Sequence, residues 1–139
     1  MKEPLECFDG SHYVAVSWMD PRCILFHKDN TDKVRHALSK LAFAMRCHAV
    51  GIHVYSIPAP RDMTAHIGLV ALLESHIALH SWPEAGVVQL DFYSCRPRTC
   101  RELVIWLRQL GAVRLEIRDV SDAHKEKSEG TRCVESWTR

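Results

Sequence analysis

Residues 68–94, GLVALLESHIALHSWPEAGVVQLDFYS, carry the pattern from which the fold can be predicted. This stretch holds three segments that are rich in Val, Ile, Leu and aromatic residues and have the length of strands. They are residues 68–73, 77–82 and 86–94. The breaks between them, at 74–75 and 83–86, are tight, and the second contains proline and glycine. Such short connections predict that consecutive strands pair antiparallel.

Two helical patterns flank these strands. One helix is predicted from a polar cap at residues 30–32 to about His48, and the other from 97–99 to Gly111, a residue that often ends a helix. Each has apolar residues at steps of three and four, which form one buried stripe. These stripes are Val34, Leu38, Leu41 and Met45 in the first helix and Leu103, Leu107 and Leu110 in the second.

The whole pattern predicts an α+β fold, a two-layer sandwich in which an antiparallel sheet carries two helices on one face. Further strands are expected at residues 12–19, 49–57 and 112–120. Residues 58–64, PAPRDMT, are predicted to be a loop because proline cannot donate to a strand ladder. The other face of the sheet needs a cover, and a second subunit is the simplest one, so we expect a homo-oligomer, a dimer.

The length of 139 residues suits one domain, predicted at residues 1–118. From residue 119 to residue 139 the chain is charged and poor in apolar side chains, and it is expected to be a mobile tail.

The balance of charge and the scattered cysteines exclude several classes of protein. The 18 basic and 17 acidic side chains nearly cancel, which disfavours nucleic acid or a membrane surface as partner and favours a small molecule. Residues 1–10 lack the apolar run of a signal peptide and no segment has the length of a membrane span, so we expect a cytoplasmic protein. Six cysteines without a C-x-x-C pair and nine histidines without H-E-x-x-H spacing predict no metal site.

Residues 74–95, ESHIALHSWPEAGVVQLDFYSC, carry a resemblance to a known family. The order E-S-H, then H-x-W-P-E-x-G, then an aspartate-containing strand that ends in Thr/Ser-Cys resembles the bacterial S-adenosylmethionine decarboxylase proenzyme family, which is pyruvoyl-dependent. The matching residues are Glu74, Ser75, His76, His80, Trp82, Pro83, Glu84, Gly86, Asp91, Ser94 and Cys95.

The resemblance implies that the chain cuts itself between Glu74 and Ser75 into a β chain, 1–74, and an α chain, 75–139. The Ser75 hydroxyl would attack the preceding carbonyl and form an ester, and elimination followed by hydrolysis would leave a pyruvoyl group. A planar trans amide is stable, so the site must supply a base and oxyanion donors. By the same resemblance, His80 extracts the proton that drives elimination.

For the mature enzyme, the resemblance implies decarboxylation of S-adenosylmethionine, which supplies the aminopropyl donor for spermidine. The pyruvoyl ketone would form a Schiff base with the substrate amine and act as electron sink. Cys95 would return a proton to the resulting carbanion. Glu84 would accept hydrogen bonds from the ribose hydroxyls, and Trp82 is a further candidate for substrate binding.

Two departures from the family's pattern keep alternatives open. Ile67 occupies the slot of a serine that assists processing, for which Thr64 or His66 could substitute, and a non-processing regulatory homologue would also lack that serine. The 58–64 loop lacks the family's phenylalanine, which stacks on adenine, and carries Asp62 instead. An acidic residue there suits the distal cation of ornithine or arginine, the alternative substrates within the same family.

Overall fold

The computed structural model of the protein describes residues 10–121 and 132–139. Its elements are β1 (Ser11–Met19), η2 (Ile24–Phe26), α1 (Thr31–Ala44), β2 (Ala49–Ala59), η3 (Pro60–Asp62), β3 (Met63–Leu72), β4 (Ser75–Trp82), η4 (Pro83–Ala85), β5 (Val87–Ser94), α2 (Arg101–Gln109), β6 (Ala112–Asp119) and β7 (Arg132–Thr138). The described strands form one sheet in the order β2-β3-β4-β5-β1-β6-β7, and every neighbouring pair is antiparallel.

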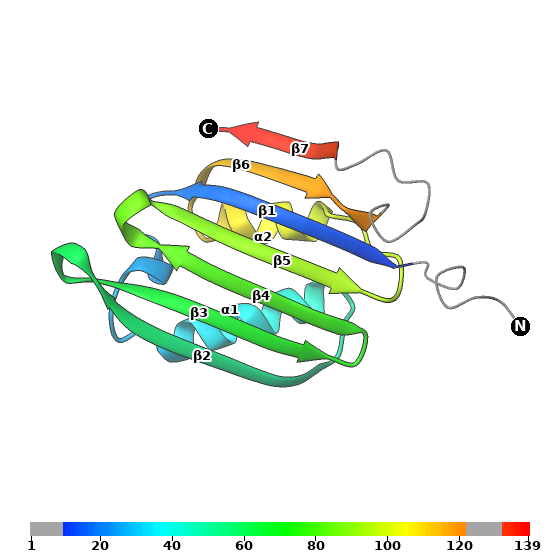
Figure 1. Cartoon of the computed structure of the whole chain (residues 1–139), viewed down its shortest axis with the longest axis horizontal. Coiled ribbons are helices and arrows are strands. Elements are labelled where there is room, and N and C mark those ends of the chain that lie inside the picture. Colours follow the sequence, from blue (N-terminus) through cyan, green and yellow to red (C-terminus); the bar gives the residue numbers. More distant parts are fainter. Residues whose placement is uncertain (1–9, 122–131) are drawn as a thin grey trace, which may run out of the picture.

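Both α-helices lie on the same face of this sheet (Figure 1), which confirms the predicted two-layer α+β sandwich. Side chains of β1 alternate between buried and half-buried positions along its length, as expected for a strand with one covered face. We call the face that carries the helices the inner face and the opposite one the outer face. No element of residues 10–121 and 132–139 therefore covers the outer face.

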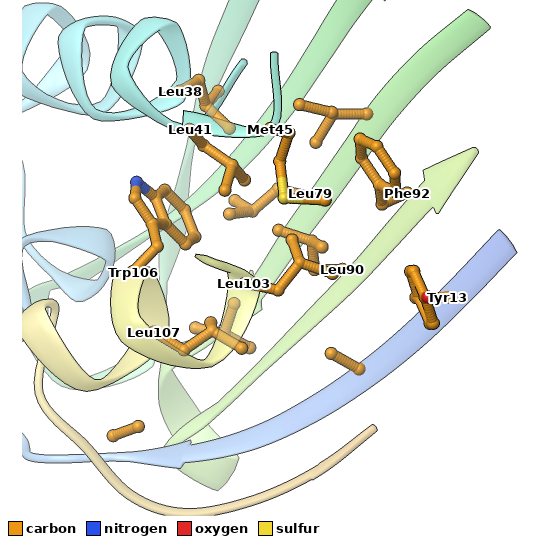
Figure 2. Packing of buried hydrophobic residues seen from close by; sticks show 14 of the residues in the cluster. Tyr13, Leu38, Leu41, Met45, Leu79, Leu90, Phe92, Leu103, Trp106 and Leu107 are labelled. Atoms are coloured by element: carbon orange, nitrogen blue, oxygen red, sulfur yellow. The ribbon is translucent and has the colours of Figure 1, made fainter. Parts of the chain in front are cut away.

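The core lies between the helices and the inner face (Figure 2). The predicted stripes do face it: Leu38, Leu41, Leu103 and Leu107 are all fully buried. The two helices also contact each other, because the Trp106 indole N–H donates to the Ala37 carbonyl oxygen at 2.8 Å. A stripe of apolar side chains at helical spacing thus fixes which side of each helix meets the sheet.

The predicted loop at 58–64 is wrong in its extent. Strand β2 continues through Pro58, which pairs with Thr64 of β3, and only the three residues of η3 make the turn. Because β2 is at the edge of the sheet, the donor that a proline lacks is tolerated there. Strands β2 and β3 therefore form one long hairpin, whose turn, η3, is at the opposite end of β3 from the β3–β4 connection.

The expectation of a mobile tail from residue 119 onward is wrong for its last part. Residues 132–138 form β7, which pairs with β6, while residues 122–131 lie outside the described residues. Trp137 packs against the core, and the Arg108 guanidinium lies 4.1 Å from the centre of its ring. Strand pairing at the free edge of β6 and burial of this one indole outweigh the polar composition of the segment.

At Gly68 the absence of a side chain allows α1 to pack closely against β3. A Cβ at Gly68 would overlap Cδ1 of Leu38, whose side chain is fully buried. Gly68→Ala is therefore expected to lower the free energy of unfolding by about 1–3 kcal/mol through overpacking, measured by urea denaturation. Gly51→Ala is the matched control, because nothing lies within 4 Å of a Cβ there. Equal losses in both variants would contradict this account.

Candidate active site

Ser75 is the first residue of β4, directly after the tight turn that follows β3. Across the sheet it pairs with Ser94 of β5, which in turn pairs with Ser11 of β1. Cys95 follows Ser94, and its thiol is free and exposed. The antiparallel register thus brings Ser75 and Cys95, 20 positions apart in the sequence, to the same end of the sheet.

Glu74 is held on both its backbone and its side chain. The Cys95 backbone N–H donates to the Glu74 carbonyl oxygen at 2.8 Å. The Glu74 carboxylate accepts hydrogen bonds from His48 Nδ1 at 2.7 Å and from the His48 backbone N–H at 3.0 Å. The bond from the His48 ring, followed by the bond from its backbone N–H, lowers the pKa of Glu74 to about 2. The peptide bond between Glu74 and Ser75 is consequently fixed in position, with its carbonyl polarised by a donor.

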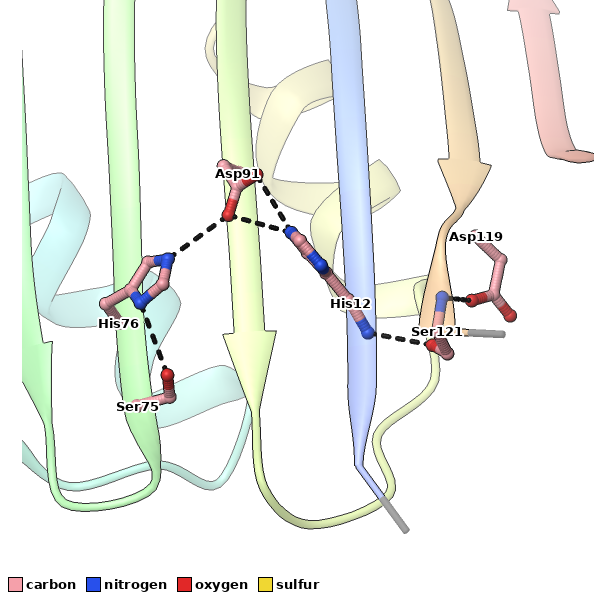
Figure 3. A network of polar contacts seen from close by, with 6 residues as sticks. All are labelled: His12, Ser75, His76, Asp91, Asp119 and Ser121. Carbon is pink, nitrogen blue, oxygen red and sulfur yellow. Dashed lines mark hydrogen bonds and ion pairs between the residues drawn. The ribbon is translucent and has the colours of Figure 1, made fainter. Parts of the chain in front are cut away.

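A polar network on the outer face begins at the Ser75 hydroxyl (Figure 3). Ser75 Oγ lies 3.2 Å from His76 Nδ1, and His76 Nε2 lies 3.3 Å from Asp91 Oδ1. His12 Nε2 reaches the same carboxylate at 2.9 Å from Oδ2. The Tyr93 ring stacks on His76, with ring centres 5.6 Å apart, and meets His12 edge-on at 5.2 Å. A serine, two imidazoles and one carboxylate are therefore in hydrogen-bonding contact across three strands.

His80 and Trp82 lie farther along β4 and away from Ser75. His80 is five positions along the strand from Ser75, a distance of about 17 Å. The His80 ring instead stacks on Trp82, with ring centres 4.0 Å apart and planes 5° apart, and the Trp82 indole N–H donates to Gln89 Oε1 at 3.2 Å. Within one chain, His80 is therefore not in contact with Ser75, although the resemblance implied that it extracts the proton that drives elimination there.

Glu84 and Asp62 are at the end of the sheet opposite to Ser75. Glu84 is in η4, which follows the last residue of β4, and Asp62 is in η3, before the first residue of β3. Both are exposed. Neither residue can contact a molecule bound at the Ser75 of the same chain, because the full length of a strand separates them.

A hollow of about 370 Å³ lies in the middle of the outer face. It is lined mainly by apolar side chains together with His80, Gln89 and Asp91; the apolar ones are Val14, Val16, Ile67, Leu69, Ala78, Leu79 and Leu90. Ile67, which takes the slot of the assisting serine, thus faces this hollow. Thr64 and His66 do not, since both are buried on the inner face, where His66 Nδ1 lies 3.0 Å from the Leu25 carbonyl oxygen. The suggestion that either could substitute for the serine is not supported.

The sequence analysis missed His12, His48, His76 and Asp91 as functional candidates. His76 and Asp91 were visible in the quoted motif, and strand alternation puts each on the same face as its cross-strand neighbours. Their convergence depends on the register between β4, β5 and β1, which no local pattern reveals. Nothing in the sequence signals that His48 meets Glu74. Of the residues that the structure describes, no group of three metal-binding side chains is placed to hold a metal ion, and no helix among them is long and apolar enough to cross a membrane.

The pair formed by Glu74 and His48 predicts a specific loss of stability in acid. A carboxyl whose pKa is lowered on folding stabilises the fold above its unfolded pKa, near 4.5, and that contribution disappears as pH falls toward 2. In a Ser75→Ala background, which lacks the hydroxyl that the resemblance assigns to self-cleavage, Glu74→Gln should lower Tm at neutral pH, and the difference in Tm should shrink between pH 4.5 and 2. Calorimetry measures both. A difference that is independent of pH would contradict the assignment.

A family model matches this chain, and three of the relatives that match it are described here. Residues 24–121 match the model described as S-adenosylmethionine decarboxylase. The S-adenosylmethionine decarboxylase proenzyme of Thermococcus kodakarensis is 26% identical over 132 residues, which cover 92% of this chain and 87% of the relative. The S-adenosylmethionine decarboxylase proenzyme of Pyrococcus abyssi is also 26% identical over 132 residues, which cover 92% of this chain and 89% of the relative. That of Thermococcus onnurineus is 31% identical over 87 residues, which span 62% of this chain and only 56% of the relative.

The same fold is found among solved structures. The adenosylmethionine decarboxylase from Aquifex aeolicus VF5 superposes with a TM-score of 0.64 over 81% of this chain and 88% of that chain. Its sequence is 22% identical, so this likeness shows the fold alone. The family model, however, matches well over half of the sequence. The chain therefore belongs to the S-adenosylmethionine decarboxylase family.

Proposed function

We propose that the protein is a decarboxylase of S-adenosylmethionine that cuts itself between Glu74 and Ser75 and derives a pyruvoyl group from Ser75. Membership of the family supports the carboxy-lyase activity and its place in the synthesis of the aminopropyl donor for spermidine. The observation that carries the self-cleavage is local. The Glu74 carbonyl already accepts a hydrogen bond from the Cys95 N–H, next to the hydroxyl that would attack it. A biosynthetic enzyme that acts on a small metabolite also suits the cytoplasmic location expected from the sequence.

The residues around Ser75 fit a pyruvoyl group at that position. Ser75 is at a strand end and is only half-buried, so a group made from it remains open to a substrate. The pyruvoyl group, once formed, supplies the electron sink for loss of carbon dioxide. The exposed Cys95 thiol, which follows the cross-strand neighbour of Ser75, is the group that returns a proton to the substrate carbon.

A homodimer would complete this site. The outer face exposes large apolar side chains that a monomer would leave in water: Tyr55, Ile57, Leu69 and Trp82. An antiparallel pairing of two outer faces would place the Ser75 end of one sheet against the opposite end of the other. His80, Trp82, Glu84 and Asp62 of a second copy would then approach the first copy's Ser75, which one chain cannot achieve. This arrangement reconciles the roles implied by the motif with the separations seen within one chain.

The first prediction concerns the cofactor. Wild-type protein is expected to give two chains that part between Glu74 and Ser75, the second with a pyruvoyl end, in a denaturing intact-mass spectrum. Ser75→Ala should leave a single chain and lose decarboxylation altogether, measured as release of labelled carbon dioxide. Full activity in Ser75→Ala would refute the pyruvoyl assignment.

A second prediction concerns the substrate and Asp62. The purified enzyme is expected to release carbon dioxide from S-adenosylmethionine and not from ornithine or arginine, as product analysis with each compound would establish. Formation of putrescine or agmatine without turnover of S-adenosylmethionine would instead assign Asp62 to the recognition of a distal cation. A wild-type chain that stays uncut would favour the regulatory homologue.

A third prediction concerns the dimer. Leu69→Lys places a charge in the hollow of the outer face and is expected to shift the protein from dimer to monomer in light scattering coupled to size-exclusion chromatography. Phe43→Lys is the matched control, because Phe43 is 85% exposed on α1, on the side of the helices. A dimer that survives Leu69→Lys but dissociates in Phe43→Lys would place the interface on the helices.

A further inference from the structure

We propose that His76, oriented by Asp91, is the base that accepts the Ser75 hydroxyl proton during self-cleavage, with the Cys95 backbone N–H holding the oxyanion. This inference rests on the proposed function, because it names the groups that perform its first chemical step. It assigns the attack on the Glu74 carbonyl to His76, so that His80 is left for the later elimination.

The contacts of His76 set its tautomer and its orientation. Its Nε2 lies 3.3 Å from Asp91 Oδ1, and a carboxylate can only accept, so Nε2 carries the proton. In the neutral imidazole Nδ1 is then unprotonated, and it lies 3.2 Å from Ser75 Oγ, where it can accept from the hydroxyl. Tyr93 stacks on the ring at an interplanar angle of 14° and restricts its rotation. Serine, histidine and aspartate are thus linked in the order that general-base activation of a nucleophile requires.

Asp91 is itself held from its other side. His12 Nε2 lies 2.9 and 3.1 Å from the two Asp91 oxygens, and the His12 backbone N–H donates to Ser121 Oγ at 2.8 Å (Figure 3). The carboxylate therefore sits between two imidazoles, and its position relative to His76 is fixed by β1 as well as by its own strand. His12 and Asp91 are positioning residues, since neither is in contact with the reacting atoms.

The Glu74 carbonyl, which the Ser75 hydroxyl attacks, is also held in place. The donor from Cys95 is 2.8 Å from the Glu74 carbonyl oxygen, within the range of effective oxyanion donors. The clamp of His48 on the Glu74 carboxylate keeps that carbonyl in place.

The step balances within the chain. The Oγ–C bond to the Glu74 carbonyl carbon forms while the hydroxyl proton moves to His76 Nδ1. The C–N bond to Ser75 then breaks, and the same proton passes to the Ser75 nitrogen, which becomes the free amine of the ester. No further reactant is needed, because the amide and the ester are isomers.

Position along β4 separates His76 from His80. Within one chain, His80 stacks on Trp82 about 17 Å from Ser75, so it is not placed to act on the hydroxyl. A dimer could bring a second copy's His80 to the same hydroxyl. Whether His76 or His80 is the base for the attack can then be decided from the intermediate that accumulates when each is replaced. Loss of the base for the attack leaves an amide, whereas loss of the base for elimination leaves an ester.

The test follows newly synthesised chains of wild type, His76→Gln and His80→Gln by intact mass, with and without hydroxylamine, which cuts esters but leaves amides intact at neutral pH. His76→Gln should slow cleavage by about 10²- to 10⁴-fold, the usual contribution of a general base, and its uncut chain should resist hydroxylamine. His80→Gln should leave an uncut chain that hydroxylamine cuts. His36→Gln, an exposed imidazole on α1, is the control and should cleave at the wild-type rate.

Cleavage of His76→Gln at the wild-type rate, or its accumulation as an ester, would overturn the proposal while leaving the self-cleavage itself intact. An uncut wild-type chain would instead overturn the proposed function. If His76→Gln fails to fold, as judged by circular dichroism against Ser75→Ala, Asp91→Asn decides, because it keeps the ring and replaces its charged acceptor with a neutral amide. Asp91→Asn should cleave at least tenfold more slowly than wild type, and its uncut chain should be an amide that resists hydroxylamine. Added imidazole should speed the cleavage of His76→Ala but not of Ser75→Ala. Cleavage rates that do not change in these variants overturn the inference.

Discussion

The antiparallel pairing of β4 with β5 is the constraint on which the other features depend. In this register Ser75 is opposite Ser94, so Cys95 meets the carbonyl of Glu74 through its backbone N–H, and His76 lies beside Tyr93. Side chains alternate along a strand, and a slip of one residue would turn His76 and His80 into the core and expose Ile77 and Leu79. Burial of those apolar side chains against the helices therefore holds the reactive groups on the outer face.

Because side chains alternate, the inner face of the sheet forms the core and the outer face carries the candidate active site. The inner face is closed by α1 and α2, and Gly68 allows α1 to come close enough to bury Leu38 completely. The outer face carries the network that joins Ser75 to Asp91, the stacked pair of His80 and Trp82, and an apolar hollow. Because the described part of one chain does not cover the outer face, assembly and chemistry share one surface in the proposed dimer.

The proposed self-cleavage requires a peptide bond that is stable until it is attacked, and the fold holds the Glu74–Ser75 bond in place without interrupting the sheet. Glu74 is clamped at its carboxylate by His48 and at its carbonyl by Cys95. Such fixed donors stabilise a developing negative charge without reorganising during the reaction. The precision of the clamp comes from three separate elements: the segment after α1, the β3–β4 turn and the end of β5.

The α+β class, the two helical stripes, the central antiparallel strands and the family resemblance of residues 74–95 could be predicted from the sequence, because each depends on the spacing of residues that are close along the chain. The sequence could not reveal the contact of His48 with Glu74, the meeting of His12, His76 and Asp91, or the pairing of residues 132–138 with β6. It also placed Pro58 in a loop, because the edge position that tolerates a proline is a property of the sheet. Only the tertiary structure decided these points, since each depends on which strands are neighbours and in what register, and distant segments set both through the packing of a shared core.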